Sequence, residues 1–195
     1  MKIKKFKVAL RRKEILKNLK LTAQIKDVTP QLEESVLKEI DRSPDYLCPS
    51  SVFETFPAEN AAQKFVEFLP VLQQETQGKK PVAVSVIAVT IGSAVEKEIE
   101  LAKKSGENQR AEILHSLALE ACSCSLNFIY RIISEEAAGE ECSLMPLEKL
   151  SGDNEKNVLR NMNTESVNIS IDDSNQLRPV YSSAAIARWL PKVKK

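Results

Sequence analysis

Four cysteines and one histidine are the side chains of this sequence best suited to bind a metal or to act as nucleophile or base. Cys122 and Cys124 are separated by one residue, and the helical period turns two such side chains about 200° apart. Zinc sites use gaps of about two to four residues and a second ligand pair, which Cys48 and Cys142 do not supply. The spacing therefore favours small core residues over a metal or redox site, because free cysteines are commonly buried.

His115 is the single histidine, and it stands among the apolar residues Leu114 and Leu117. A single histidine excludes a multi-histidine metal site, and we expect no catalytic triad. Two hypotheses stay open for it: a general base, or a structural or surface residue. No serine has the sequence setting of an activated nucleophile.

Asp172 and Asp173 are adjacent carboxylates that could serve acid/base chemistry or bind a cation. Adjacent side chains diverge in an extended chain. Ser174 and Asn175 follow them, and this composition is typical of a turn with capping side chains. The sequence therefore favours a turn at this position.

Charge is distributed unevenly, although the net charge is only +1. The first twenty residues contain nine Lys/Arg and one Glu, and we expect a basic N-terminal helix over about 1–20. This helix either contacts phosphates or an acidic surface of another protein, or it is a solvated amphipathic helix. The segment 135–152 is acidic, and we expect a loop there, either solvated or contacting a basic partner or the basic arm. Its glutamates include Glu135, Glu136, Glu140 and Glu141.

Length and composition predict one α+β domain spanning residues 1–195, because 43% of the residues are hydrophobic, enough to form a core. With five glycines, the chain has neither a Walker motif nor Gly-x-Gly-x-x-Gly. The longest apolar run is about ten residues, too short to span a bilayer, and the basic start lacks the apolar segment of a leader. These features predict a cytoplasmic protein with reduced thiols and neither a nucleic-acid nor a membrane partner.

Hydrophobic periodicity predicts the elements that position these residues. Helices are expected over 9–20, 61–74, 94–104, 108–134 and 153–163. A further helix opens at Thr29 and Pro30, as cap and first helical residue, with an apolar stripe of Leu32, Val36, Leu37 and Ile40. Residues 43–57 are expected to form a loop or short edge strand, and two strands are expected over 166–172 and 176–187. Trp189 is expected in the core.

The segment 82–91 is apolar at nearly every position, which predicts a central strand covered on both faces. It ends in Thr90-Ile91-Gly92, and a charged helix follows directly. The end of such a strand is a place where main chain approaches a ligand or partner, so Thr90 and Gly92 are candidate site residues.

An ordered set of segments resembles the activation domain of cobalamin-dependent methionine synthase, in its short stand-alone bacterial form. Thr90-Ile91-Gly92 ends a strand as in that family, and the small-residue-rich stretch 111–128 is similar to the helix that follows it, with His115 where the family has Asp. The other matching segments are 12–19, 145–148, 167–174 and 179–186.

The resemblance implies a curved α+β domain with a twisted, mainly antiparallel sheet flanked by helices. It also implies contact with a corrinoid-carrying domain, binding of S-adenosylmethionine, and methyl transfer that rescues oxidised cobalamin held by the partner. The partner would be a corrinoid-binding protein or a methionine synthase lacking this domain, and a flavodoxin-like protein would supply the electron. The chemistry belongs to the cofactors, and the protein positions them.

The chain departs from the family's ligand signature, Arg-x-x-x-Gly-Tyr. Glu141 and Cys142 stand where the family has Gly-Tyr, and no arginine precedes them at the required spacing. By position in the family pattern, the candidate ligand-binding residues are Glu141, Cys142, Ser143, Thr90, Gly92 and Asp173.

Three functional hypotheses follow. The first is an accessory protein for corrinoid remethylation that is not an enzyme by itself. The second is a degenerate regulatory module that keeps the partner surface and has lost the ligand. The third, from another class, is a small hydrolase or transferase that uses Asp173 or His115.

Overall fold

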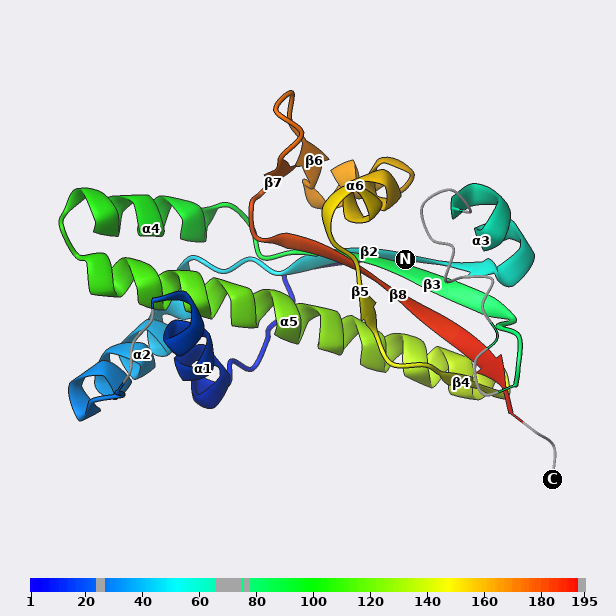
Figure 1. The fold of residues 1–195 in the computed structure, drawn as a ribbon, viewed down its shortest axis with the longest axis horizontal. Helices are drawn as coiled ribbons and strands as arrows, with labels where there is room; N and C mark the ends of the chain where they lie inside the picture. The colour runs from blue at the N-terminus through cyan, green and yellow to red at the C-terminus, as the bar shows by residue number, and fades with distance from the viewer. Residues whose placement is uncertain (24–26, 66–74, 76–77, 193–195) are drawn as a thin grey trace.

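A six-stranded antiparallel sheet forms the centre of the protein (Figure 1). The computed structural model describes residues 1–23, 27–65, 75 and 78–192. The strand order is β1 (Lys2–Lys4), β2 (Ser50–Pro57), β3 (Ala83–Thr90), β8 (Ser182–Pro191), β4 (Cys142–Leu144), and β5 (Glu148–Lys149) also pairs with β8. A separate hairpin joins β6 (Ser170–Ile171) and β7 (Leu177–Arg178).

The strand β3 is central, as its apolar sequence predicts, because β2 and β8 pair with it along its whole length. Side chains alternate between the two faces of a strand, and Val84 and Val86 enter one buried cluster while Ile87 and Val89 enter another. Hydrophobic side chains therefore cover both faces of the sheet.

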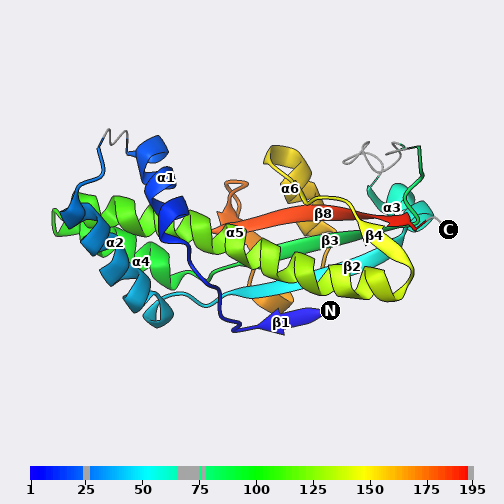
Figure 2. The ribbon, with the colours of Figure 1, turned by 90° about the horizontal axis from the view of Figure 1, so that it is seen from below.

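Helices cover the two faces of the sheet (Figure 2). The long helix α5 (Asn108–Gly139) lies across one face through Leu126, Ile129 and Ile133. The other face is covered by α3 (Ala58–Phe65), α6 (Gly152–Arg160) and the short 3-10 turn η3 (Thr164–Val167). This is the α+β arrangement with a curved antiparallel sheet flanked by helices that the sequence predicts.

A cluster of helices extends beyond the sheet at one end (Figure 1). The N-terminal half of α5 packs there against α1 (Arg12–Thr22), α2 (Pro30–Arg42) and α4 (Ala94–Lys104), and the 3-10 turn η1 (Ser43–Asp45) follows α2. Thr29 caps α2 by accepting a hydrogen bond from the N–H of Leu32 at 3.2 Å, as predicted. The predicted stripe is wrong at Leu37, which is 42% exposed, whereas Glu39 is buried because Arg110 pairs with it at 2.9 Å.

The helix α5 is the one described helix long and apolar enough to cross a membrane, but 61% of its most apolar window is buried inside the protein. The sequence analysis counted only uninterrupted apolar runs, the longest of about ten residues, and therefore did not identify α5 in this way. Polar residues such as Ser116 and Glu120 interrupt the apolar sequence of α5, although both are buried in the structure. α5 serves as the helix on which the sheet and the helical cluster both pack.

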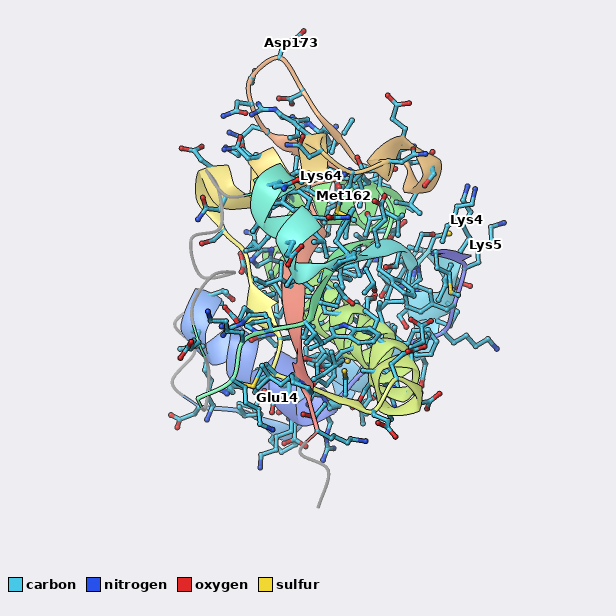
Figure 3. All side chains as sticks on the ribbon, turned by 90° about the vertical axis from the view of Figure 1, so that its right-hand side faces the viewer. Lys4, Lys5, Glu14, Lys64, Met162 and Asp173 are labelled. Atoms are coloured by element: carbon cyan, nitrogen blue, oxygen red, sulfur yellow. The ribbon has the colours of Figure 1, made fainter. Side chains whose placement is uncertain are left out.

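Three local predictions are wrong. Residues 50–57, expected as loop or edge strand, form β2 inside the sheet because β1 covers its outer edge. Residues 2–4, expected within the basic helix, form β1 instead, and Lys4 and Lys5 extend away from the body of the protein (Figure 3). The acidic segment 135–152, expected as a loop, contains the last turn of α5, then β4 and β5, because residues 142–144 and 148–149 pair with β8.

Two further predictions differ in extent. The helix expected over 61–74 is α3, described from Ala58 to Phe65, and residues 66–74 lie outside the described part of the chain. The strand expected over 176–187 is divided into β7 and β8, because Pro179 lacks the N–H that a ladder needs. Trp189 is buried as predicted, and its indole N–H donates to the hydroxyl of Ser85 at 2.8 Å.

Candidate functional site

The candidate residues predicted from the sequence lie at opposite ends of strand β8. Thr90 pairs with Ser182 at the beginning of β8, whereas Cys142 pairs with Pro191 at its end. Nine residues of extended chain separate these positions, a distance of about 30 Å. A single small ligand therefore does not contact both groups.

The segment that replaces the family's Gly-Tyr pair is occupied with packing and strand pairing. Glu141 adopts φ +53°, in the region that favours glycine, and its carbonyl accepts the N–H of Lys192 at 2.9 Å. The Cys142 side chain is buried under α5, and Ser143 Oγ donates to the carbonyl of Leu190 at 3.4 Å. Cys142 thus offers no surface in place of the tyrosine.

Gly92 is needed for close packing of two loops. Its φ is +82°, and a Cβ there would lie 3.3 Å from Cβ of Cys48. The N–H of Gly92 donates to Oγ1 of Thr90 at 3.1 Å. The hydroxyl of Thr90 in turn donates to the carbonyl of Tyr181 at 3.4 Å. The Thr90 end of β3 is therefore fixed against residue 181.

Asp173 lies at the exposed tip of the β6–β7 hairpin, on a loop that extends from the body of the protein (Figure 3). Its neighbour Asp172 forms the turn by accepting the N–H groups of Ser174 and Gln176 and the Nε of Arg178 at 2.9–3.0 Å. Asp172 therefore caps the turn with its side chain, as the turn interpretation predicts.

The two helical cysteines point to different surroundings. Cys122 Sγ donates to the carbonyl of Tyr181 at 3.3 Å, whereas Cys124 Sγ donates to the carboxylate of Glu120 at 3.1 Å. In the described part of the chain, no group of three His, Cys, Asp or Glu side chains is arranged to hold a metal ion.

Tyr181, at the entry to β8, gathers the polar groups of this end of the sheet. Its hydroxyl lies 2.7 Å from Nδ1 of His115. Its carbonyl accepts the N–H of Ile91 at 3.2 Å as well as the hydroxyl of Thr90 and the thiol of Cys122. Strand β3, helix α5 and strand β8 are tied together at this one residue.

Two pockets share Tyr181 as a wall. One, of ≈ 230 Å³, includes His115 and Glu112. The other, of ≈ 280 Å³, we call the Tyr181 groove; its walls come from α1, α5, β5 and the start of β8, namely Asn18, Leu119, Cys122, Ser123, Lys149 and residues 180–183. The lining combines Tyr181 and two apolar side chains with several polar groups, and small-ligand sites likewise combine apolar surface with placed polar groups.

The lining of the groove includes exposed apolar side chains and one charged side chain. Leu119 and Val180 are 36% and 51% exposed. Lys149 supplies a positive charge. Glu155, beside the groove, accepts the N–H of Ala184 at 2.9 Å, and burial raises the pKa of its carboxyl.

The thiol of Cys122 and the phenol of Tyr181 are protonated and neutral near pH 7. Burial raises the pKa of the Cys122 thiol to about 12 and that of the Tyr181 phenol to about 12. Without a thiolate, Cys122 is a poor nucleophile. The arrangement is suited to binding a ligand by contacts and hydrogen bonds, and it does not assemble an activated nucleophile.

A larger pocket of ≈ 550 Å³ lies between the N-terminal segment and residues 43–49. Its aromatic hydroxyl, on Tyr46, already donates to the carbonyl of Glu39 at 2.8 Å. Its lining also includes Lys5, Lys7, Ser43 and Asp45, and it contains no residue that the sequence analysis named as a ligand-binding candidate.

The sequence prediction missed Tyr181 and Lys149 as site residues. A usable signal was present in Val180-Tyr181-Ser182-Ser183, where an aromatic and two hydroxyl residues open an apolar strand. The approach of Lys149 depends on the pairing of β5 with β8, which no local pattern indicates.

No protein-family model and no curated protein matches the chain. The structure is similar to the crystal structure of the MetH reactivation domain bound to AdoHcy, with a TM-score of 0.62, 12% sequence identity, and coverage of 100% of this chain and 79% of that one. At this identity the similarity establishes the fold, which agrees with the fold implied by the sequence resemblance.

Proposed function

We propose that this chain is a stand-alone counterpart of the reactivation domain, which binds an adenosyl ligand of the AdoMet and AdoHcy class in the Tyr181 groove. The observation that carries the proposal is the match of the whole chain to a domain solved with AdoHcy. The ring of Tyr181 and the exposed side chains of Leu119 and Val180 fit the apolar and aromatic part of such a ligand.

The role of the chain would be to present the ligand to a corrinoid-dependent methyltransferase carried by another protein. When bound, AdoMet supplies the methyl group and the partner's corrinoid receives it. The residues of this chain hold and orient the ligand: Tyr181 is fixed by His115, and Cys122 stays protonated and does not compete for the methyl group. The partner is a corrinoid-binding protein or a methionine synthase lacking this domain, and a flavodoxin-like protein is the electron donor.

Isothermal titration with AdoHcy and AdoMet tests the site. The wild-type protein is expected to bind both, and Leu119→Glu is expected to abolish binding by placing a charge on the apolar wall. Leu37→Glu is the matched control, because Leu37 is a similarly exposed leucine on α2, away from the groove. No binding by the wild-type protein would overturn the assignment of the groove.

A second candidate function is a module that binds the corrinoid partner without the adenosyl ligand. The burial of Cys142 under α5 favours it, because the tyrosine of the family signature has no substitute there. A pull-down with a cobalamin-loaded methyltransferase domain, with and without AdoMet, distinguishes the two. If the methyltransferase domain is captured equally well with and without AdoMet, and the titrations show no binding of AdoMet or AdoHcy, the second function is supported.

A further inference from the structure

The main chain of Lys149 is held in place by pairing with β8. In β5, Glu148 and Lys149 pair with Ile186 and Ala185 of β8, and the N–H of Leu150 donates to the carbonyl of Ala184 at 3.0 Å. Successive side chains of a strand point to opposite faces. Glu148 binds Arg188 at 2.6 Å, whereas Lys149 lines the Tyr181 groove.

The ammonium of Lys149 has no ion-pair partner among the described residues. Glu155 is the carboxylate beside the groove, but its Oε1 accepts the N–H of Ala184 instead. The positive charge of Lys149 nonetheless reaches the interior of the groove, since it opposes the effect of burial on the pKa of both Cys122 and Glu155. An anion that entered the groove would meet the ammonium of Lys149, whose main chain is fixed by pairing with β8.

Two apolar side chains also line the groove. Leu119 and Val180 are the exposed hydrophobic residues there, and Val180 is fixed because its N–H donates to Glu96 at 2.7 Å. A ligand that satisfies both parts of the groove has an apolar ring system and an anionic end. AdoHcy and AdoMet combine an adenosyl group with an amino-acid carboxylate.

We infer that Lys149 is the specificity-determining residue of the Tyr181 groove, where its ammonium binds the carboxylate at the amino-acid end of the adenosyl ligand. This inference rests on the proposed function. A lysine ammonium binds a carboxylate as a point charge with up to three hydrogen-bond donors.

The test compares ligands that differ at that end. AdoHcy carries the amino-acid carboxylate, 5′-methylthioadenosine lacks it, and AMP carries a phosphate in its place. The wild-type protein is expected to bind AdoHcy roughly tenfold to a hundredfold more tightly than methylthioadenosine, the range for one charged hydrogen-bonded pair. Lys149→Met is expected to remove this preference and to leave methylthioadenosine binding unchanged.

Two variants control the experiment. Lys192→Met removes a charge at the other end of β8, where Lys192 follows the strand and is exposed, and it is expected to keep the preference. Lys149→Arg is expected to restore most of it, because a cation is retained. Circular dichroism checks that each variant is folded.

The outcomes separate the two proposals. If no adenosine compound binds the wild-type protein, the proposed function fails, and this inference with it. If AdoHcy binds but methylthioadenosine binds equally well, or Lys149→Met keeps the preference, the inference fails and the function stands. Tighter binding of AMP than of AdoHcy would assign the cation to phosphate and overturn the carboxylate assignment.

Discussion

The hydroxyl of Tyr181 and the Nδ1 of His115 lie 2.7 Å apart, although the two residues are 66 positions apart in the sequence. Their rings are tilted, with centroids 5.7 Å apart. The contact joins the residue before β8 to the N-terminal half of α5 and fixes the aromatic residue of the groove. The lone histidine of the chain therefore has a structural partner at the candidate site.

Removing this hydrogen bond should destabilise the protein modestly. A double-mutant cycle with Tyr181→Phe and His115→Ala is expected to show a coupling free energy of about 1 kcal/mol, as for a neutral hydrogen bond. Urea unfolding followed by circular dichroism measures it. Tyr130→Phe is the control, because within the described residues the hydroxyl of Tyr130 makes no hydrogen bond. A coupling near zero would show that the contact contributes nothing to stability.

Stability should fall at alkaline pH. Burial raises the pKa of Cys122 from 9.0 to about 12, so between these values the folded state retains a proton that the unfolded state loses. Stability is complete below pH 9 and declines above it, by up to about 1.4 kcal/mol per pH unit for one such group. Tyr181 adds to the decline above its ordinary pKa of 10.0.

Urea unfolding at several pH values between 8 and 11.5 checks this linkage. The variant Cys122→Ala should show a shallower decline, whereas Cys48→Ala should keep the wild-type slope because Cys48 is exposed. Equal slopes for all three proteins would contradict the burial of an un-ionised thiol at position 122.

Two glycines with similar backbone angles should respond differently to substitution. A Cβ on Gly92 (φ +82°) would face Cys48, while a Cβ on Gly106 (φ +75°) would have nothing within 4 Å. Gly106→Ala should cost about 1–2 kcal/mol for the left-handed conformation alone. Gly92→Ala should cost more, because Cβ of Cys48 must move. Thermal unfolding of both variants measures the difference, and equal losses would mean that the two loops separate freely.

The ion pair between Arg11 and Glu120 should contribute more to stability than a surface pair. Glu120 Oε1 lies 2.7 Å from Nε of Arg11, and its side chain is 3% exposed. Glu120→Gln is expected to cost about 1.5–3 kcal/mol, the range for a charged hydrogen bond. Glu33→Gln breaks the exposed Arg12–Glu33 pair at 3.4 Å and should cost less than about 1 kcal/mol.

Chemical denaturation of the two variants makes this comparison. Similar losses for both would indicate that Arg11 gains as much from water as from Glu120, and that the basic N-terminal segment is not anchored by this pair.

Local patterns predicted the elements whose environment is uniform along their length. The apolar side chains of β3 are buried on both faces only if the strand lies inside the sheet with a layer of side chains on each face. The bounds of α4 follow from the turn before it and from Ser105-Gly106 after it. Thr29 and Pro30 began α2 where expected. These are cases in which the nearest residues decide the conformation.

Predictions failed where a distant strand decided the conformation. Residues 50–57, 142–144 and 148–149 carry mixed or polar sequences, and they became strands only because β1, β3 and β8 lie beside them. The candidate ligand-binding residues were affected most, because their positions depend on strand pairing. Thr90 and Cys142 both adjoin β8, but at opposite ends, a separation that depends on register.

The sequence by itself determined the α+β class, the central strand, the helical cap at Thr29 and the divergence of Cys122 from Cys124, because each follows from the spacing or chemistry of neighbouring residues. Only the tertiary structure brought Tyr181, Cys122 and Lys149 to one groove and placed His115 against the hydroxyl of Tyr181. Only it placed Thr90 and Glu141 at opposite ends of β8. The reason is physical: strand pairing sets the distance between remote segments through hydrogen bonds common to all residues, and such bonds leave no signature in side-chain order.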